Sequence, residues 1–456
     1  MNFSELIPFS GGSRLASFSP SGFYLAEAAQ FRANVRDSKS LELLQSFACA
    51  DQITDLAWSP DSLFLMCVMR KRALVQVWSL EHPDWACKID EGVAGLVAAC
   101  WAPDSRRVLT TADFNLRVTV WSLTDKTVAY LKHPKACSKY IAFSSDGCLL
   151  ALAERRGLKD CVSVFNCGGD TGWQLVAHFD AGTEDLDGLA WSPDATALAC
   201  WDGCLRSRVA IFSPTGTQLH TFSAYPLERG LGTKCVEWSP SSQFLAVGCY
   251  DGSLRLLNNI TWEPLAEMRG QTCVEPPPSS SASSSGIVAY REIESPSGLP
   301  RYEASSPGDP PIPIPVVKPD PSKPNPKVGI GAVHFSPCSR YVAFREDSQP
   351  GALWLWELNR LKPSALLLHR NPVRSFAWDP SAFNPPRLAI VTGTPCVYMW
   401  STAGCLAAQV PLMDRCGAFV ITNVSWHPDG DALLLTSDAD ACVCFLESGG
   451  AAGQAG

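Results

Sequence analysis

The stretch Trp58-Ser59-Pro60-Asp61 ends one apolar run and precedes the next, and it decides the fold because it returns along the chain. Its counterparts are Phe18-Ser19-Pro20, Trp101-Ala102-Pro103-Asp104, Phe143-Ser144-Ser145-Asp146, Trp191-Ser192-Pro193-Asp194, Trp238-Ser239-Pro240, Phe335-Ser336-Pro337, Trp378-Asp379-Pro380 and Trp426-His427-Pro428-Asp429. The steps between these aromatic anchors are 40, 43, 42, 48, 47, 97, 43 and 48 residues. A period of about 40–45 residues, with a strand-ending aromatic residue and a Pro/Asp turn, is typical of a WD40-type β-propeller.

Each repeat is expected to form four short strands, a to d. In the second repeat these are residues 53–58, 63–68, 74–78 and 85–89. Strand b of this repeat is apolar throughout, which indicates a strand with both faces buried. The Pro-Asp pair after the anchor predicts the a–b turn, because proline presets φ and aspartate bonds to its own backbone.

Nine anchors predict an all-β fold made of a single closed ring of about nine four-stranded blades, with seven or eight blades as alternatives. The ninth repeat holds only three strands before a Gly/Ala-rich tail, whereas residues 3–9 belong to no repeat. We therefore expect the N-terminal segment to supply the missing outer strand and close the ring, which also removes exposed sheet edges. The predicted divisions are 1–271 (blades 1–6 and the closing strand), 329–448 (blades 7–9) and 449–456 (a flexible tail).

The one long step contains an insertion, residues 272–328, that we expect to be disordered. Residues 276–326 include 14 Pro and 11 Ser. A segment of this composition buries too little apolar surface to offset the entropy lost when the chain is ordered. Within it, Ile287-Val288-Ala289-Tyr290 is compatible with a short strand or a docking peptide. Ser295-Pro296 and Ser306-Pro307 have the form of proline-directed phosphorylation sites, although exposed linker residues have the same form.

Composition excludes several function classes. The net charge of −8 argues against a sequence-independent nucleic-acid binder, and no apolar run approaches the ~20 residues that span a bilayer. The first residues lack the features of a secretory signal. The 19 cysteines are scattered through apolar strands, so we interpret them as small buried side chains in a reduced, intracellular protein and expect no metal or cofactor.

Sequence motifs of catalysis are missing. The chain has no G-x-x-x-x-G-K-[ST] phosphate loop, no H-E-x-x-H zinc helix and no G-x-S-x-G nucleophile elbow. We interpret His334 and His427 as packing residues, and His133 and His369 as structural hydrogen-bonding residues in the d–a connections. We therefore predict that the protein is not an enzyme.

The charge pattern points instead to a binding face. In a propeller the b–c and d–a connections lie on the same face, the usual site of partner binding. Solvated charged loops would produce the same pattern, but basic and acidic sectors side by side suit a charged partner helix. The candidate partner-binding residues are Arg70, Lys71, Arg72, Glu154, Arg155, Arg156, Lys159, Arg206 and Asp185.

Some segments resemble one family beyond the general repeat. They are Met1–Glu5, 74–81, 88–92, 94–98, 151–156 and 238–248. Together they are similar to the WRAP-type family of WD repeat-containing protein eight, which acts at centrosomes and spindle poles, and the resemblance covers nearly the whole chain. The insertion and the C-terminal tail depart most from the family.

The resemblance implies a non-catalytic adaptor at centrosomes, centriolar satellites and spindle poles. Its implied partner is a coiled-coil protein of the SSX-two-interacting (Msd-type) class. The implied roles are anchoring of microtubule minus ends, spindle assembly, centriole maturation and cilium formation. An alternative is a propeller-type translation initiation factor that contacts the ribosome, against which the acidic balance weighs. A third, disfavoured alternative is a propeller enzyme with a central metal or hydrolytic site.

Overall fold

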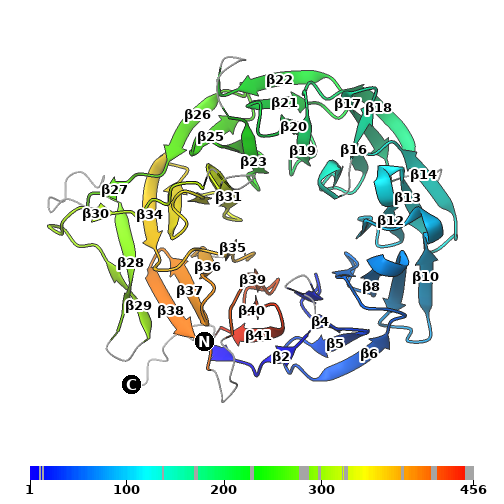
Figure 1. Cartoon of the computed structure of the whole chain (residues 1–456), viewed down its shortest axis with the longest axis horizontal. Coiled ribbons are helices and arrows are strands. Elements are labelled where there is room, and N and C mark those ends of the chain that lie inside the picture. The colour runs from blue at the N-terminus through cyan, green and yellow to red at the C-terminus, as the bar shows by residue number, and fades with distance from the viewer. Residues whose placement is uncertain are drawn as a thin grey trace, which may run out of the picture.

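The computed structural model describes residues 1–9, 12, 15–135, 138–168, 173–225, 231–276, 287–295, 299–320, 322, 327–381, 385–411 and 419–446. They form nine sheets that stand side by side around one axis, with strand a of each blade innermost and strand d on the rim (Figure 1). The prediction of a nine-bladed propeller is confirmed, and seven or eight blades are excluded. The predicted flexible tail, 449–456, lies outside the described residues.

The first six blades follow the repeat in order. Blades 1 to 3 consist of β3 (Ala16–Phe18), β4 (Tyr24–Ala29), β5 (Arg32–Asp37), β6 (Leu43–Ala48); β7 (Asp55–Trp58), β8 (Phe64–Met69), β9 (Leu74–Ser79), β10 (Ala86–Asp90); and β11 (Ala98–Trp101), β12 (Arg107–Thr111), β13 (Arg117–Ser122), β14 (Val128–Lys132). Blades 4 to 6 consist of β15 (Ile141–Phe143), β16 (Leu149–Arg156), β17 (Lys159–Asn166), β18 (Gln174–Asp180); β19 (Leu186–Trp191), β20 (Leu198–Asp202), β21 (Arg208–Phe212), β22 (Gln218–Ser223); and β23 (Thr233–Trp238), β24 (Phe244–Cys249), β25 (Ser253–Asn258), β26 (Pro264–Arg269).

The last three blades follow the insertion. They consist of β31 (Ile330–Phe335), β32 (Tyr341–Glu346), β33 (Ala352–Glu357), β34 (Lys362–Leu368); β35 (Ser375–Trp378), β36 (Arg387–Val391), β37 (Cys396–Ser401), β38 (Gly404–Gln409); and β39 (Asn423–Trp426), β40 (Ala432–Thr436), β41 (Asp440–Phe445). Short 3-10 turns occupy η2 (Arg70–Arg72), η3 (Gly92–Ala94), η4 (Asp113–Asn115) and η5 (Ser138–Tyr140).

The ring closes between the two ends of the described chain. β1 (Asn2–Phe3) and β2 (Ile7–Pro8) both pair antiparallel with β41, so the N-terminal segment is the outer strand of blade 9 (Figure 1). The predicted closure is therefore confirmed. Ile7 is buried in the core that blade 9 shares with blades 1 and 2.

The anchor aromatics connect neighbouring blades. In six blades the anchor is tryptophan, and its Nε1–H donates to the backbone carbonyl of the residue just before the anchor of the preceding blade. The pairs are Trp58 with Ser17, Trp101 with Ala57, Trp191 with Ala142, Trp238 with Ala190, Trp378 with His334 and Trp426 with Ala377, at 2.8–3.2 Å. Blades 1, 4 and 7 have phenylalanine anchors, which carry no such donor.

The a–b turns form a second series of contacts on the opposite face from the b–c and d–a connections. In four blades, the serine four residues after the anchor accepts a backbone N–H from the preceding blade's turn. The acceptors are Ser62, Ser105, Ser242 and Ser339, at 2.9–3.0 Å from their donor nitrogens. The recurrent turn sequence therefore both reverses the chain and holds adjacent blades together.

The predicted disorder of 272–328 is wrong for its described residues. β28 (Val288–Glu294) adds to blade 7 by pairing parallel with β34, and β29 (Pro300–Ala304) pairs with β28. β27 (Cys273–Val274) and β30 (Ile312–Pro313) form a separate two-strand sheet beside them (Figure 1). The composition argument overlooked an existing sheet edge, which offers hydrogen bonds to an incoming strand and a core to Ile287, Ala289 and Ile314.

Buried polar contacts dock this inserted hairpin onto blade 8. One Glu292 carboxylate oxygen accepts from the Tyr398 hydroxyl at 2.8 Å, and the other accepts from the Arg370 backbone N–H at 3.0 Å. The Tyr302 hydroxyl lies 3.2 Å from the ring of His369, which is fully buried. Burial lowers the pKa of His369, while nearby Glu292 partly opposes that shift. His369 thus has a structural role, as the sequence predicted.

Residues 295 and 306 border the hairpin. The backbone N–H of Ser295 donates to the Leu299 carbonyl at 2.9 Å, and that of exposed Ser306 donates to Asp309 Oδ2 at 2.6 Å. The Ser279–Ser285 run lies outside the described residues. Phosphorylation at Ser295 and Ser306 stays a prediction.

Replacing Ile7 by Ala should weaken closure. We expect a loss of about 2–5 kcal/mol of unfolding free energy, because the change leaves a cavity behind β2. Chemical denaturation measures the loss, and size-exclusion chromatography detects association through the loosened edge of blade 9. Glu5→Ala, an exposed neighbour, is the control. Equal stability of the two variants would contradict the closure.

Replacing Trp101 by Phe should remove one inter-blade hydrogen bond. We expect it to cost about 0.5–1.5 kcal/mol more than the same change at Trp356, whose Nε1–H has no partner among the described residues. Denaturant titration of both variants gives the difference. If Trp356→Phe lowers the unfolding free energy as much as Trp101→Phe does, the loss at Trp101 comes from the smaller side chain and not from the hydrogen bond.

Acidification should release the inserted hairpin. The pKa of His369 is lowered when docked, so on undocking it returns toward about 6.5 and protons favour the undocked form below that pH. Hydrogen exchange in β28 and β29 should therefore accelerate as pH falls below about 6.5. His369→Gln should flatten this pH dependence, whereas exposed His82→Gln should leave it intact. If the pH dependence of hydrogen exchange is the same in His369→Gln as in the wild type, protonation of His369 does not release the hairpin.

Candidate protein-interaction face

The structure places all nine predicted residues on the face formed by the b–c and d–a connections. Arg70–Arg72 form η2 in the b–c connection of blade 2, and residues 154–159 form the β16–β17 hairpin of blade 4. Arg206 lies in the b–c connection of blade 5, and Asp185 lies in the d–a connection before it. The topological part of the prediction therefore agrees with the structure, while binding itself stays a prediction.

Two of the nine belong to an ion-pair network that joins blades 4 and 5. The Asp160 carboxylate is completely buried and accepts from Lys135 Nζ and Arg155 Nε, each at 2.8 Å, and from the Leu186 backbone N–H. Asp185 Oδ1 accepts from Lys135 at 2.7 Å and from Arg155 at 2.9 Å. Its hydrogen bond with Lys135 lowers the pKa of Asp185. Arg155 and Asp185 are therefore structural residues, whatever else they bind.

Sequence reasoning missed Lys135 and Asp160. Lys135 lies in the d–a connection before blade 4, and Asp160 lies 25 residues further on at the start of β17, next to predicted Lys159. One signal could have indicated this pair: a cation precedes strand a of blade 4, and an aspartate stands at the start of strand c of the same blade.

Glu154 is also a packing residue. Its side chain is buried, Ser163 Oγ donates to Oε1 at 2.6 Å, and Arg156 Nη2 lies 2.7 Å from Oε2. A partner has little access to this carboxylate. Its role is to hold the base of the β16–β17 hairpin in place.

The remaining predicted residues divide into paired and unpaired cations. Arg70 pairs with Asp55 at 2.9 Å, Arg72 with Asp51 at 3.3 Å, and Arg206 with Glu184 at 3.0 Å. Lys71 and Lys159 are exposed and form no ion pair with other described residues. Among the nine candidates, these two lysines are the charges that a partner can pair with at the least cost.

Exposed apolar side chains accompany the charges on this face, and the sequence analysis did not identify them. They occur in the connections of blades 2 to 6: Val93, Phe114, Leu116, Leu158, Leu205 and Leu231. Phe114 is 93% exposed and Leu158 is 91% exposed. Both have positive φ, +57° and +69°, a conformation that is costly for residues with a side chain. These side chains add exposed apolar surface to the face that carries the predicted charges.

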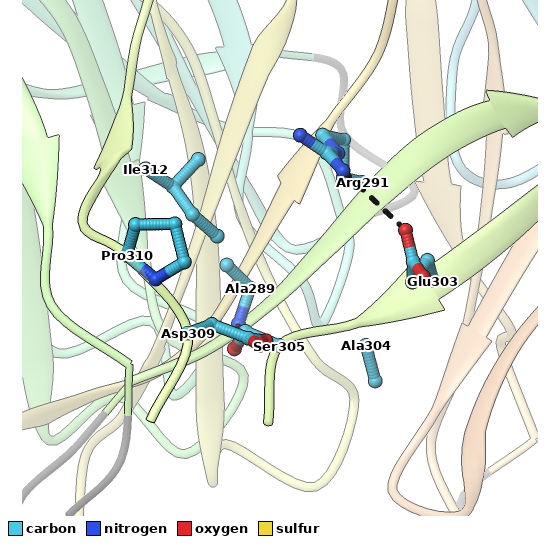
Figure 2. A pocket seen from close by; sticks show the side chains of 8 residues that line it. All are labelled: Ala289, Arg291, Glu303, Ala304, Ser305, Asp309, Pro310 and Ile312. Carbon is cyan, nitrogen blue, oxygen red and sulfur yellow. Dashed lines mark hydrogen bonds and ion pairs between the residues drawn. The ribbon is translucent and has the colours of Figure 1, made fainter. Parts of the chain in front are cut away.

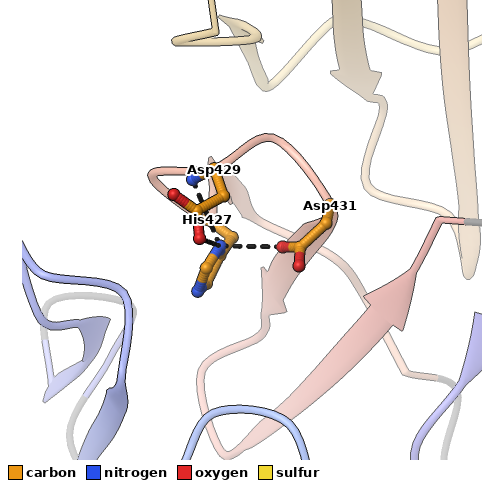
Figure 3. Close-up of side chains that lie close together, drawn as sticks. All are labelled: His427, Asp429 and Asp431. Carbon is orange, nitrogen blue, oxygen red and sulfur yellow. Dashed lines mark hydrogen bonds and ion pairs between the residues drawn. The ribbon is translucent and has the colours of Figure 1, made fainter. Parts of the chain in front are cut away.

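A cluster of potential metal ligands lies on the opposite face, in the a–b turn of blade 9. Figure 3 shows Asp429 and Asp431 directed at His427. His427 Nε2 lies 2.7 Å from the carbonyl of Gly22 in blade 1, and Nδ1 lies 2.8 Å from Asp431. A Cβ at Gly22 would approach the ring to 2.8 Å, so the contact requires glycine. Because both ring nitrogens are engaged within the protein, we assign the cluster to ring closure.

Two of the hollows among the described residues lie on the rim and have no link to the predicted face. One, of about 160 Å³, lies between the inserted hairpin and the segment that returns from it, beside the Arg291–Glu303 pair (Figure 2). It is smaller than the ~300–1,000 Å³ of typical small-molecule sites. The other, of about 400 Å³, lies between blades 2 and 3 and includes Trp85, Trp121, Lys88 and Lys126. Neither contains any of the nine predicted residues.

None of the helices in the described part of the chain is long and apolar enough to cross a membrane.

Comparison with solved structures supports the architecture. The C-terminal WD40 domain of Sif2 matches with a TM-score of 0.51 at 12% identity, over 98% of this chain and 99% of that one. A eukaryotic initiation factor matches with a TM-score of 0.57 at 13% identity, over 88% and 90%. At such low identity these matches show the propeller fold alone, so they do not favour a role in translation.

Sequence comparison is more specific. The family model "WD domain, G-beta repeat" matches residues 216–258, and propellers of this class are typically non-catalytic interaction scaffolds. An uncharacterized WD repeat-containing protein of Schizosaccharomyces pombe is 25% identical over 81% of this chain and 73% of its own length. Mouse WD repeat-containing protein WRAP73 is 46% identical over 98% of this chain and 96% of its own length. With that identity over nearly the full length of both proteins, the chain belongs to the WRAP73 family of WD repeat proteins.

Proposed function

We propose that this protein is a non-catalytic adaptor at centrosomes, centriolar satellites and spindle poles. It binds a coiled-coil protein of the SSX-two-interacting (Msd-type) class, and the complex anchors microtubule minus ends, assists spindle assembly and supports centriole maturation and cilium formation. The observation that carries the proposal is the near full-length similarity to WRAP73, together with the WRAP-type segments of the sequence.

The geometry of the ring supports an adaptor. Inter-blade hydrogen bonds and buried ion pairs hold the blades rigidly, so the b–c and d–a connections are presented to a partner in a fixed arrangement. A preformed surface loses little conformational entropy when it binds. Most cations on the face are paired and the net charge is −8, which favours a protein partner over nucleic acid.

Proximity labelling in dividing cells tests the location. We expect pericentriolar neighbours, including the coiled-coil partner. A neighbourhood made up of ribosomal proteins would reject the proposal in favour of the translation-factor alternative.

Charge reversal of the two unpaired lysines tests the face. Lys71→Glu combined with Lys159→Glu should weaken binding of the purified coiled-coil partner about tenfold, because each change replaces an attraction at the interface rim by a repulsion. Arg155 is unsuitable for this purpose, since its reversal would also disturb buried Asp160.

The matched control combines Lys39→Glu with Lys126→Glu. Both lysines are exposed in c–d connections, on the opposite face, and the charge change is identical. Isothermal titration at two salt concentrations compares the variants. Equal weakening by both pairs would show a general charge effect and not a contact on the proposed face.

A further inference from the structure

The β16–β17 hairpin has the longest strands in the described part of the chain. β16 and β17 have eight residues each and stay paired to Arg156↔Lys159, so only Gly157 and Leu158 form the turn. The tip therefore projects from the b–c and d–a face on a regular two-strand ribbon.

The base of the ribbon is rigid. Arg155 binds buried Asp160, and Glu154 accepts from Ser163 across the two strands. Lys135 extends the network to the next blade through Asp185. A partner thus meets a tip whose position is already set, which lowers the entropy lost on binding.

Three features at the tip are unfavourable in the free protein. Leu158 occupies the second turn position at φ +69°, where two-residue hairpins favour glycine. Its side chain is almost fully exposed. Arg156 lies directly opposite Lys159, and like charges in such a cross-strand pair repel. Within the hairpin, the Arg156–Glu154 ion pair offsets part of the charge repulsion, but the exposure of Leu158 and its positive φ remain. Violations of local preference of this kind are expected at functional sites.

We propose that this tip is an anchor for an acidic, amphipathic segment of the partner. An apolar residue of that segment covers Leu158, and flanking carboxylates pair with Lys159 and with Arg156, which then shares its charge with Glu154. Charge complementarity supports this choice of occupant, because the tip is locally basic in a chain of net charge −8. The inference rests on the proposed function, since it specifies how the same face holds its coiled-coil partner.

Substitution of Leu158 by Asn separates the strain from the contact. Asparagine tolerates the left-handed conformation, so the free variant should melt at the same or a higher temperature than the wild type. Its affinity for the purified coiled-coil partner should nevertheless fall about tenfold. Ile260→Asn is the control, because Ile260 is similarly exposed in a c–d connection on the opposite face. Wild-type affinity of Leu158→Asn would overturn the proposal.

Cross-linking from the tip identifies the occupant. A photo-cross-linking amino acid is incorporated at position 158 in dividing cells, with position 260 as control, and cross-linked peptides are mapped by mass spectrometry. An acidic segment of the coiled-coil protein supports both proposals. An acidic segment of a different protein supports the tip and rejects the proposed partner. A basic segment, or no cross-link above the position 260 control, overturns the tip as an acidic-segment anchor.

Discussion

The fold depends on the pairing of the N-terminal strands with β41. Blade 9 receives only three strands from the C-terminal end of the described chain, and without β1 and β2 it would present an unpaired edge. In an open array each blade would still contact its neighbours, but the two terminal blades would each expose an apolar face. Pairing Ile7 with Ala441 covers the edge, and the shared core around Ile7 joins the last blade to the first.

A recurrent hydrogen bond, donated by the indole N–H of the anchor tryptophan, joins adjacent blades. The junctions that lack this bond occur at regular intervals around the ring. The anchors read Phe-Trp-Trp three times around the ring, so the indole bond is missing where blades 9 and 1, 3 and 4, and 6 and 7 meet. Other bonds cross each of these junctions. His427 contacts Gly22 at the first, Arg107 donates to the Cys167 carbonyl at the second, and Glu237 accepts from the Phe335 backbone N–H at the third. Each junction thus has a polar contact of its own.

Contacts with buried polar groups distinguish the charged side chains that stabilise the fold from those that a partner can bind. Arg155, Glu154 and Asp185 looked equivalent to Lys159 as exposed loop charges, but all three make fixed contacts. Arg155 binds buried Asp160, Glu154 accepts from Ser163, and Asp185 binds Lys135 and Arg155. Removing one partner of a buried pair costs far more than removing an exposed lysine. A charge pattern in a loop therefore locates a face without showing which of its members can bind a partner.

The sequence by itself determined the propeller fold, the strand order within each blade and the closure, and it favoured nine blades over seven or eight. It could do so because anchors such as Trp58 and their Pro-Asp turns are local signals that recur every 40–48 residues outside the insertion. It also determined the face on which residues 70–72 and 154–159 lie, since propeller topology assigns each connection to one side. Only the tertiary structure decided that β28 pairs with β34, that Lys135 reaches Asp160, and that Leu158 is left exposed. These three features depend on contacts between residues distant in the chain, or on their absence, and composition and periodicity carry no information about such contacts.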